Sequence, residues 1–342
     1  MDNIDLNGVP IGDLNRDGLD LLDDATLQSY AAHFAHHGFE NESRNFRLLT
    51  QILDIYKHHD ARELVDLFHR SIPFPSYPWF QSESLASYLN FSAHYFQQLT
   101  AAKEANRPNI PFFAFPKTGS SFVTSTFSTA LDIPFGITSV EGRHAVPAWS
   151  KLFTSGPGVL HDHLWMNKAN SAIFLTAKFE RMIVHVRDPR QIIISIAHHV
   201  PESPTTAQIF GDVRVSDLKS RSPAEIIQNV IDRGQFISAY NRWLEDWLEE
   251  RHKFRIMISR YEVMNEDVHK FFHDVLKFCN ADQDAVATTM TYLDNQSDKE
   301  RGKNFNFRAG SSDEWKDVLS DQQKDAIARQ MQGTKLRELY ED

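Results

Sequence analysis

Cysteine is almost absent from this chain, since Cys279 is the one cysteine among 342 residues. A single thiol excludes an internal disulfide framework and is typical of proteins from a reducing compartment. No apolar run reaches the about 18 residues that a membrane-spanning helix needs, and residues 1–24 are polar and acidic. We therefore expect neither a membrane span nor a signal peptide, and the expected location is cytoplasmic.

An excess of positive charge is also missing, because 46 acidic residues outnumber 36 basic ones and give a formal net charge of −10. A nucleic-acid partner is not expected for such a chain, and any anion site must be a local basic pocket. The hydrophobic content of 41% and charged content of 24% are ordinary for a globular protein. The length allows one large α/β domain with an added segment, or two domains.

The N-terminal third predicts a helical segment. Apolar residues recur at three- and four-residue steps from Asp24 to His69 and again from about Glu83 to Glu104. We expect residues 1–105 to pack as helices on an α/β domain formed by residues 106–342. The histidines of this segment fit no standard set of metal ligands, so no metal is expected.

The remainder alternates between strand and helix patterns, which predicts a parallel sheet with helices on both faces. The predicted strands are Ile110–Phe115, Gly158–Leu164, Arg181–Arg187 and Phe254–Ser259. The predicted helices are Gly119–Leu131, Asp188–His199, one long helix Pro223–Glu250, Asp267–Cys279 and Ala285–Leu293, followed by a helical tail.

The first of these strands ends in a turn that predicts an anion site. Lys117, Thr118, Gly119, Ser120 and Ser121 follow the apolar strand and open a helix, where backbone N–H groups, a cation and hydroxyl groups can converge on a phosphate. The lysine precedes Gly119, so the turn is not the usual phosphate loop G-x-x-x-x-G-K-[ST]. A plain strand–turn–helix connection with a surface lysine is the alternative.

Arg187 and Ser195 predict a second phosphate contact. Arg187 ends a strand and Ser195 lies about two turns into the next helix, so both can face the carboxyl edge of the sheet. A surface pair between Arg187 and Asp188 is the alternative. Arg308 and Gly310 are a weaker third element, since glycine permits close approach of a ligand and arginine adds charge.

His163 is the candidate general base, since a neutral imidazole beside a phosphate site can take a proton from an acceptor hydroxyl. It lies at the end of a predicted strand, two residues after His161. The choice between the two histidines is open, and a histidine that only bonds a backbone carbonyl is the alternative.

Together these elements resemble the sulfotransferases that use 3′-phosphoadenosine-5′-phosphosulfate (PAPS). Pro116–Phe122 resembles the family motif P-K-[ST]-G-[ST]-[ST]-[WF], and Arg187–Arg190 with Ser195 resembles its 3′-phosphate element. Asp162–Trp165 resembles the segment T-H-L-P, and Phe305 to Trp315 resembles F-x-R-K-G-x-x-x-x-W. Tyr261-Glu262 matches an adenine-side segment. The resemblance covers about residues 110–331, whereas the N-terminal hundred residues match nothing in the family.

The resemblance implies a three-layer, P-loop-NTPase-like sulfotransferase fold with an added N-terminal helical segment. It implies PAPS as co-substrate, with His163 as the base and Lys117 stabilising charge on the leaving phosphate. The implied cofactor-binding residues are Lys117, Thr118, Gly119, Ser120, Ser121, Phe122, Arg187, Ser195, Tyr261, Phe307, Arg308 and Gly310. Within this set, Phe122 and Tyr261 would lie on either side of the adenine.

Three positions depart from the family pattern. Ala309 stands where a lysine is frequent, Trp165 stands where a proline follows the histidine, and the segment Lys316–Asp321 carries an acid at a usually apolar position of a dimerisation motif. A monomer and a homodimer both remain open.

The acceptor is expected to be a small or medium-sized alcohol, phenol or amine. Aromatic residues near the predicted substrate loops Gly136–Ser155 and Pro201–Ser222 indicate a partly apolar site; they are Phe135, Trp149, Phe153, Trp165 and Phe210. Secondary metabolism or lipid modification would suit such an enzyme. A small-molecule or nucleotide kinase and a silent nucleotide-binding scaffold protein are the alternatives, although no clear aspartate after an apolar strand offers a magnesium site.

Overall fold

The computed structural model describes residues 98–140, 144–145, 147–154, 156–199, 221–296 and 312–341. The predicted N-terminal segment lies outside these ranges except for its end, which is helical over residues 98–104. There Leu99 and Ala102 are buried in the core, and Gln98 donates a hydrogen bond to Asp132. The division of the chain at residue 105 stays a prediction.

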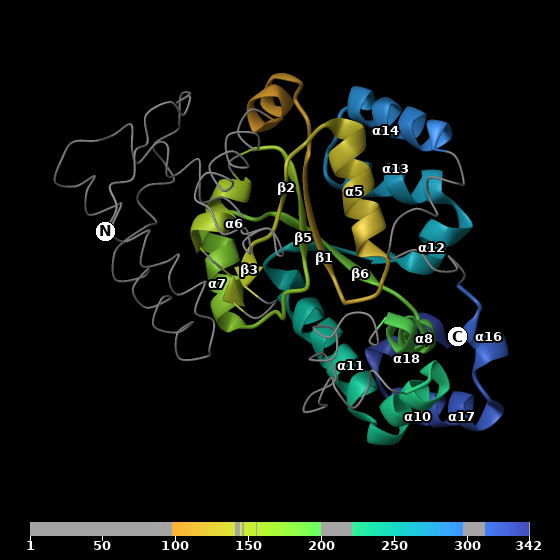
Figure 1. Cartoon of the computed structure of the whole chain (residues 1–342). Helices are drawn as coiled ribbons and strands as arrows, with labels where there is room; N and C mark the ends of the chain where they lie inside the picture. Colours follow the sequence, from red (N-terminus) through yellow and green to blue (C-terminus); the bar gives the residue numbers. More distant parts are fainter. Residues whose placement is uncertain are drawn as a thin grey trace, which may run out of the picture.

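A sheet of five parallel strands forms the centre of the described structure (Figure 1), in the order β2-β5-β1-β6-β7. The strands are β1 (Asn109–Ala114), β2 (Phe135–Gly136), β5 (Gly158–Asp162), β6 (Arg181–Val186) and β7 (Arg255–Arg260). Four of these are the predicted strands, with bounds shifted by one or two residues. Because β5, β1 and β6 are neighbours, the residues that follow them meet at one edge of the sheet.

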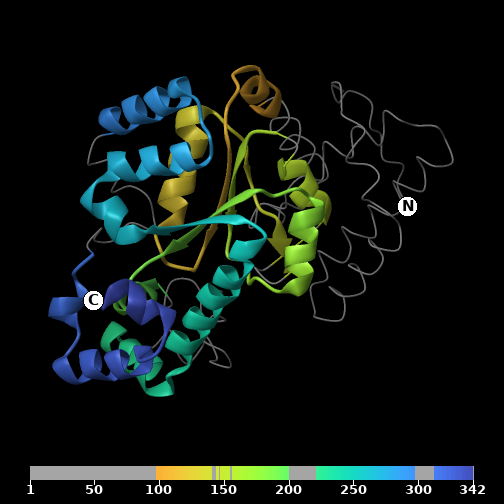
Figure 2. The same ribbon diagram turned by 180° about the vertical axis from the view of Figure 1, so that it is seen from behind.

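Helices cover both faces of the sheet, so the predicted three-layer α/β fold is confirmed (Figures 1 and 2). One layer contains α5 (Ser120–Leu131), α12 (Tyr261–Glu266), α13 (Val268–Phe278) and α14 (Gln283–Asn295). The other layer contains α7 (Lys168–Thr176), α8 (Pro189–His199), α10 (Pro223–Arg233) and α11 (Gln235–Glu249), with α16 (Trp315–Val318), α17 (Asp321–Met331) and α18 (Lys335–Tyr340) of the C-terminal tail. Phe112 of β1 packs in the first layer's core and Phe113 in the second, as strand alternation requires.

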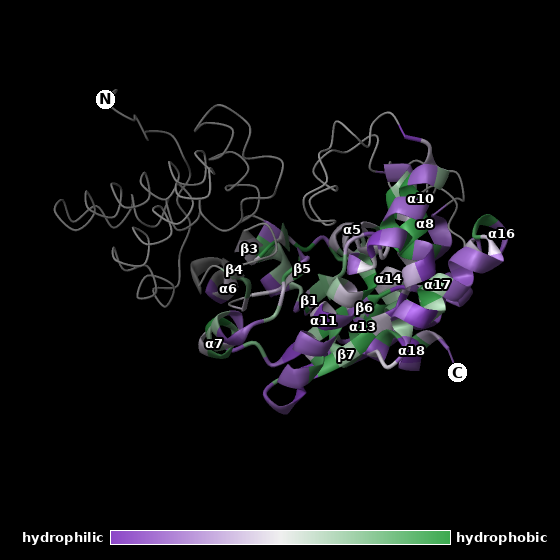
Figure 3. Ribbon diagram, turned by 90° about the horizontal axis from the view of Figure 1, so that it is seen from below, coloured by the Kyte–Doolittle hydropathy of each residue, from purple (hydrophilic) through white to green (hydrophobic). Residues whose placement is uncertain are grey.

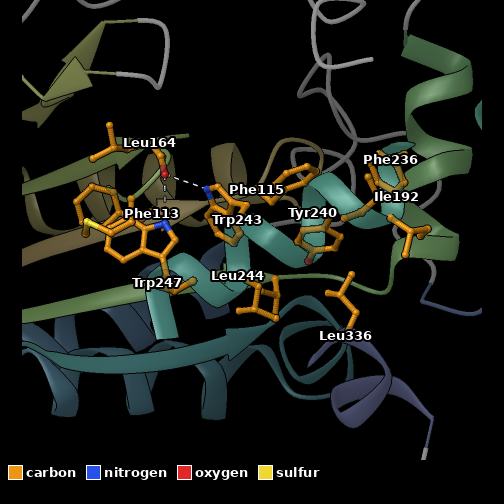
Figure 4. Packing of buried hydrophobic residues seen from close by; sticks show 14 of the residues in the cluster. Phe113, Phe115, Leu164, Ile192, Phe236, Tyr240, Trp243, Leu244, Trp247 and Leu336 are labelled. Carbon is orange, nitrogen blue, oxygen red and sulfur yellow. Dashed lines mark hydrogen bonds between the residues drawn. The ribbon is translucent and has the colours of Figure 1, made fainter. Parts of the chain in front are cut away.

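Aromatic residues of α11 fill the second core and also fix the chain beyond β5. The ring of Trp247 lies 4.6 Å from that of Phe113, and the ring of Tyr240 stacks at 4.2 Å on Phe115. The indole nitrogens of Trp243 and Trp247 both donate to the carbonyl oxygen of Leu164, at 2.9 and 3.2 Å (Figure 4). This carbonyl directly follows His163, so the packing of α11 helps to hold the position of the candidate base.

The single long helix predicted over Pro223–Glu250 is wrong, because the chain forms α10 and α11 with a break at Gly234. Gly234 has a φ of 65°, a left-handed conformation that ends α10 and that glycine adopts without steric cost. The apolar stripe continues on both sides of the break, with Ile231 and Phe236 both buried, which explains why the pattern resembled one helix.

Figure 3 shows polar and apolar residues alternating along α10 and α17, each of which buries one side.

The predicted substrate loop Gly136–Ser155 has regular structure of its own. It contains the two-stranded hairpin of β3 (Ser139–Val140) and β4 (His144–Ala145), followed by α6 (Pro147–Thr154). The second predicted loop, Pro201–Ser222, lies outside the described ranges except for its last two residues, of which Ser222 caps α10. Among the described helices, none is long and apolar enough to span a membrane.

Candidate active site

The turn after β1 brings together a cation and the start of a helix. Lys117 and Gly119 have left-handed φ values of 69° and 84°, and the Thr118 hydroxyl closes the turn by donating to the carbonyl oxygen of Phe115 at 2.8 Å. A left-handed conformation costs a non-glycine residue such as lysine about 1–2 kcal/mol. Helix α5 then begins at Ser120 without a side-chain cap. Its first N–H groups are therefore available to an anion.

Gly119 is required at this position for two reasons. Its φ of 84° is strained for a residue with a side chain, and a Cβ atom there would lie 2.8 Å from ring carbons Cδ2 and Cε2 of Tyr261. The Tyr261 ring also lies under the guanidinium of Arg187, whose Cζ is 3.9 Å from the ring centroid. Tyr261 therefore contacts both predicted phosphate elements, the turn after β1 and the end of β6.

Arg187 is buried at the end of β6, with 8% of its surface exposed. Its Nη1 donates to the carbonyl oxygen of Lys117 at 3.1 Å, which links the two predicted phosphate elements directly. Its backbone N–H donates to the Tyr240 hydroxyl at 2.9 Å, and that hydroxyl donates to the Arg187 carbonyl at 3.0 Å. Burial lowers the pKa of Arg187, although an arginine remains charged at neutral pH.

Arg187 is buried rather than exposed at the surface, and the carboxylate of its neighbour Asp188 pairs with another residue. Asp188 binds Arg190, with 2.6 Å between Oδ2 and Nη2, and its backbone N–H donates to Oε1 of Glu262 at 2.8 Å. The Arg190 guanidinium lies 3.8 Å from the ring centroid of Trp315. These contacts fasten the start of α8 to α12 and to the C-terminal tail.

His163 follows β5 and is held in one tautomer. Its Nδ1 lies 2.7 Å from the carbonyl oxygen of Ala114. Since a carbonyl only accepts hydrogen bonds, Nδ1 carries the hydrogen and Nε2 keeps a lone pair in the neutral ring. Burial lowers the pKa of His163 and the Lys117 charge lowers it further, while the Ala114 bond and Asp162 oppose the shift.

His161 lies beside His163, with 5.0 Å between the ring centroids. Its Nε2 is 2.8 Å from the Ser120 hydroxyl oxygen, so it contacts the first residue of α5. Burial lowers the pKa of His161 well below its usual value, and the nearby rings of His163 and His185 lower it further. Both histidines are thus neutral at pH 7.

The role of Asp162 was not predicted from the sequence: it holds the segment after β2 at the same edge. Its Oδ2 accepts hydrogen bonds from the backbone N–H groups of Thr138 and Ser139 at 2.9 and 2.8 Å, and Oδ1 accepts from the Ser139 hydroxyl. Burial raises the pKa of Asp162, and these hydrogen bonds oppose the rise. A carboxylate between two histidines at the end of a predicted strand was the available signal.

The remaining predicted site residues differ in their exposure and in their neighbours. Ser121 is exposed, and Phe122 is half-buried with its ring 6.2 Å from that of Phe272. Ser195 is half-buried on α8. Phe307, Arg308 and Gly310 lie outside the described residues, as do Phe210 and the side chain of Trp149. The contact of Phe122 and Tyr261 with an adenine stays a prediction.

Comparisons with known proteins give the family. A family model described as "Sulfotransferase domain" matches residues 150–340, a range that includes His163 and Arg187 and begins after the Lys117 turn. Among solved structures, the chain is similar to the mouse sulfotransferase SULT7A1 complexed with PAP, at 14% identity and a TM-score of 0.44, over 72% of this chain and 93% of that one. No curated protein matches the chain. Because the family model covers more than half of its length, the chain belongs to the sulfotransferase domain family and is a sulfotransferase enzyme.

Proposed function

We propose that this sulfotransferase moves a sulfuryl group from PAPS to a hydroxyl or amine of a small or medium-sized acceptor. The observation that carries the proposal is the convergence of three elements at the ends of neighbouring strands. They are the Lys117 turn after β1, His163 after β5 and Arg187 after β6. The cation and the buried guanidinium at this edge form a donor set for an anionic nucleotide, and the imidazole beside them supplies a base.

The residues present fit the two phosphate ends of such a nucleotide. The uncapped start of α5 and the half-buried Lys117 suit the 5′ end, since helix N–H groups and a lysine both favour anions. Arg187 and Ser195 suit the 3′-phosphate, with Arg308 and Gly310 as further predicted contacts. When bound, PAPS supplies an activated sulfuryl group with a phosphate as leaving group. Lys117 neutralises charge that develops on that phosphate.

His163 takes the proton of the acceptor in this proposal. Its Nδ1–H is held by Ala114, so the Nε2 lone pair is the basic atom, and its lowered pKa keeps the ring neutral at pH 7. The Nε2 atom of His161 is already engaged with Ser120. This difference supports His163 over His161 as the base.

The surroundings of the histidines support a partly apolar acceptor. The ring of Phe135 lies 6.0 Å from that of His161, and Trp165, two residues after His163, is half-buried. Aromatic groups beside the base favour phenols and alcohols with an apolar body over a sulfated polysaccharide, which requires a basic groove. The net charge of −10 agrees with this preference.

The test is transfer from labelled PAPS. The full chain is incubated with 35S-labelled PAPS and a panel of phenols, aliphatic alcohols and amines, with γ-labelled ATP in parallel. We expect label from PAPS in at least one product, a mass gain of one sulfuryl group, and none for the Lys117→Met variant. Transfer from ATP alone, or equal transfer by the variant, would contradict the proposal.

A further inference from the structure

We infer that His185 is a positioning residue that aims the backbone N–H of Gly119 at the anion site. The inference rests on the proposed function only for the identity of the anion. No role for His185 was predicted from the sequence, and its hydrogen bonds go to Ser259 and Thr118, which lie outside both predicted substrate loops.

His185 is enclosed in the core on the α5 side of the sheet. Its exposed fraction is 0%, and its ring lies 5.0 Å from the ring of Phe112 and 5.6 Å from that of Phe271. In register it pairs with Ser259 of β7 on one side and with Ala114 of β1 on the other. A fully buried imidazole among phenyl rings must satisfy both nitrogens internally.

Both nitrogens have a partner, and the partners select one tautomer. Nε2 lies 3.0 Å from the carbonyl oxygen of Thr118, and Nδ1 lies 2.9 Å from the hydroxyl oxygen of Ser259. Because the carbonyl can only accept, Nε2 carries the hydrogen; in the neutral ring Nδ1 then accepts from the Ser259 hydroxyl. Burial lowers the pKa of His185 to about 3, so the ring is neutral.

The bond to Thr118 fixes the direction of the next amide. In a trans peptide the C=O and N–H groups point in opposite directions. Holding the Thr118 oxygen toward His185 therefore points the Gly119 N–H away from the core. Within the described residues, this N–H has no hydrogen-bond partner, and it precedes the uncapped start of α5.

Arg187 acts in the same way one peptide earlier. Its Nη1 holds the carbonyl oxygen of Lys117, which turns the N–H of Thr118 to the opposite side. His185, in β6, and Arg187, directly after it, are two residues apart and lie on the same side of the chain, so this strand end aligns two successive amides. Glycine at position 119 can rotate with little steric cost, so the peptide before it needs such an external restraint.

The consequence is preorganisation of an anion-binding group. Donors that are already aimed at a developing charge need no rearrangement when the charge forms. The Ser259–His185–Thr118 chain supplies this restraint from the interior, without contact with the ligand.

The test compares His185→Leu, which fills the buried position with an apolar side chain and loses the donor, with His185→Gln, whose Nε2 can donate to the Thr118 oxygen. Binding of 3′-phosphoadenosine 5′-phosphate is measured by calorimetry well below each melting temperature. Loss of one hydrogen bond predicts about tenfold weaker binding for His185→Leu, and His185→Gln should recover most of it. Phe271→Leu is the control, since it perturbs the packing of the His185 ring but removes no hydrogen bond.

Unchanged affinity of His185→Leu, with only a lower melting temperature like that of Phe271→Leu, would overturn the inference. A second measurement needs no ligand and no variant. Long-range 15N–1H spectra of the wild-type protein should show His185 neutral with its hydrogen on Nε2, and a hydrogen on Nδ1 would overturn the inference. If the wild type does not bind the bisphosphate, the proposed function fails, while the tautomer and the carbonyl 13C shift of Thr118 in the variants still decide the role of His185.

Discussion

His163 donates its Nδ1 hydrogen to the carbonyl oxygen of Ala114 over 2.7 Å, so the end of β1 orients the imidazole that follows β5. Ala114 is also the last residue of the strand that leads to the Lys117 turn. The candidate base and the candidate anion turn therefore share one strand end as their support.

Replacing His163 by alanine should abolish most of the catalytic rate while nucleotide affinity stays near normal. General-base catalysis contributes about 10²–10⁴-fold, so kcat should fall by that factor. His161→Ala is the matched control and should have a much milder effect. Steady-state kinetics with calorimetric binding of the bisphosphate checks both, and the reverse ranking of the two variants would reassign the base.

The pH dependence of the rate should follow the protonation of His163, with lower activity at lower pH. The base acts in its neutral form, and burial together with Lys117 lowers its pKa below 6.5. Activity should be constant at neutral pH and fall as the pH drops below 6.5. A pH profile of kcat/KM measures this fall in activity. A fall with its midpoint above pH 7 would contradict a lowered pKa for the base.

Losing Arg187 should weaken nucleotide binding strongly. Truncating one partner of a buried charge pair costs about 2–5 kcal/mol, so Arg187→Ala should bind the bisphosphate at least about 30-fold more weakly. Arg187→Lys keeps the charge and should lose less. A loss of binding free energy below about 1 kcal/mol is typical of an exposed ion pair. Such a small loss would mean that Arg187 does not bind the nucleotide.

Gly119→Ala should destabilise the fold more than Gly333→Ala. Both glycines have a left-handed φ, at 84° and 75°, but nothing lies within 4 Å of a Cβ at Gly333, whereas the Tyr261 ring lies 2.8 Å from one at Gly119. Strain of this kind costs about 1–3 kcal/mol, and the clash adds to it. Denaturant unfolding gives the free energies, and equal losses would mean that the Tyr261 ring moves aside.

Acid should destabilise the protein in a defined window. The pKa values of His161, His163 and His185 are all lowered on folding, so below about pH 6.5 the unfolded chain takes up protons that the folded chain does not. As the pH falls, each such histidine lowers the free energy of unfolding by about 1.4 kcal/mol per pH unit, until the pKa of the folded state is reached. His185→Gln should show a shallower loss of stability with falling pH than the wild type. Parallel slopes would contradict the neutral state of His185.

Much of this arrangement was predictable because its signals are local. A buried parallel strand is an apolar run, so β1 and β6 were found, and the residues that follow them carry the chemistry: Lys117 and Arg187. The family resemblance added the order of the elements, and the family match confirmed it at the level of the fold and the enzyme class.

The parts of the fold and of the site that the sequence did not predict depend on contacts between distant segments. The role of His185 requires the register of β6 with β7, which pairs it with Ser259, and the approach of Thr118 from a turn 67 residues earlier. The break at Gly234 interrupts a continuous apolar stripe, so periodicity alone could not locate it. The contact between Gly119 and Tyr261 likewise appears only once α12 is packed against the turn.

We propose above all that the sheet edge formed by Lys117, His163 and Arg187 binds the nucleotide of PAPS. Calorimetric titration of the full chain with 3′-phosphoadenosine 5′-phosphate, beside an identical titration with ATP, tests it most directly. We expect clear binding of the bisphosphate, weaker binding of ATP, and loss of bisphosphate binding in Arg187→Ala. Binding of ATP with no detectable binding of the bisphosphate would contradict it.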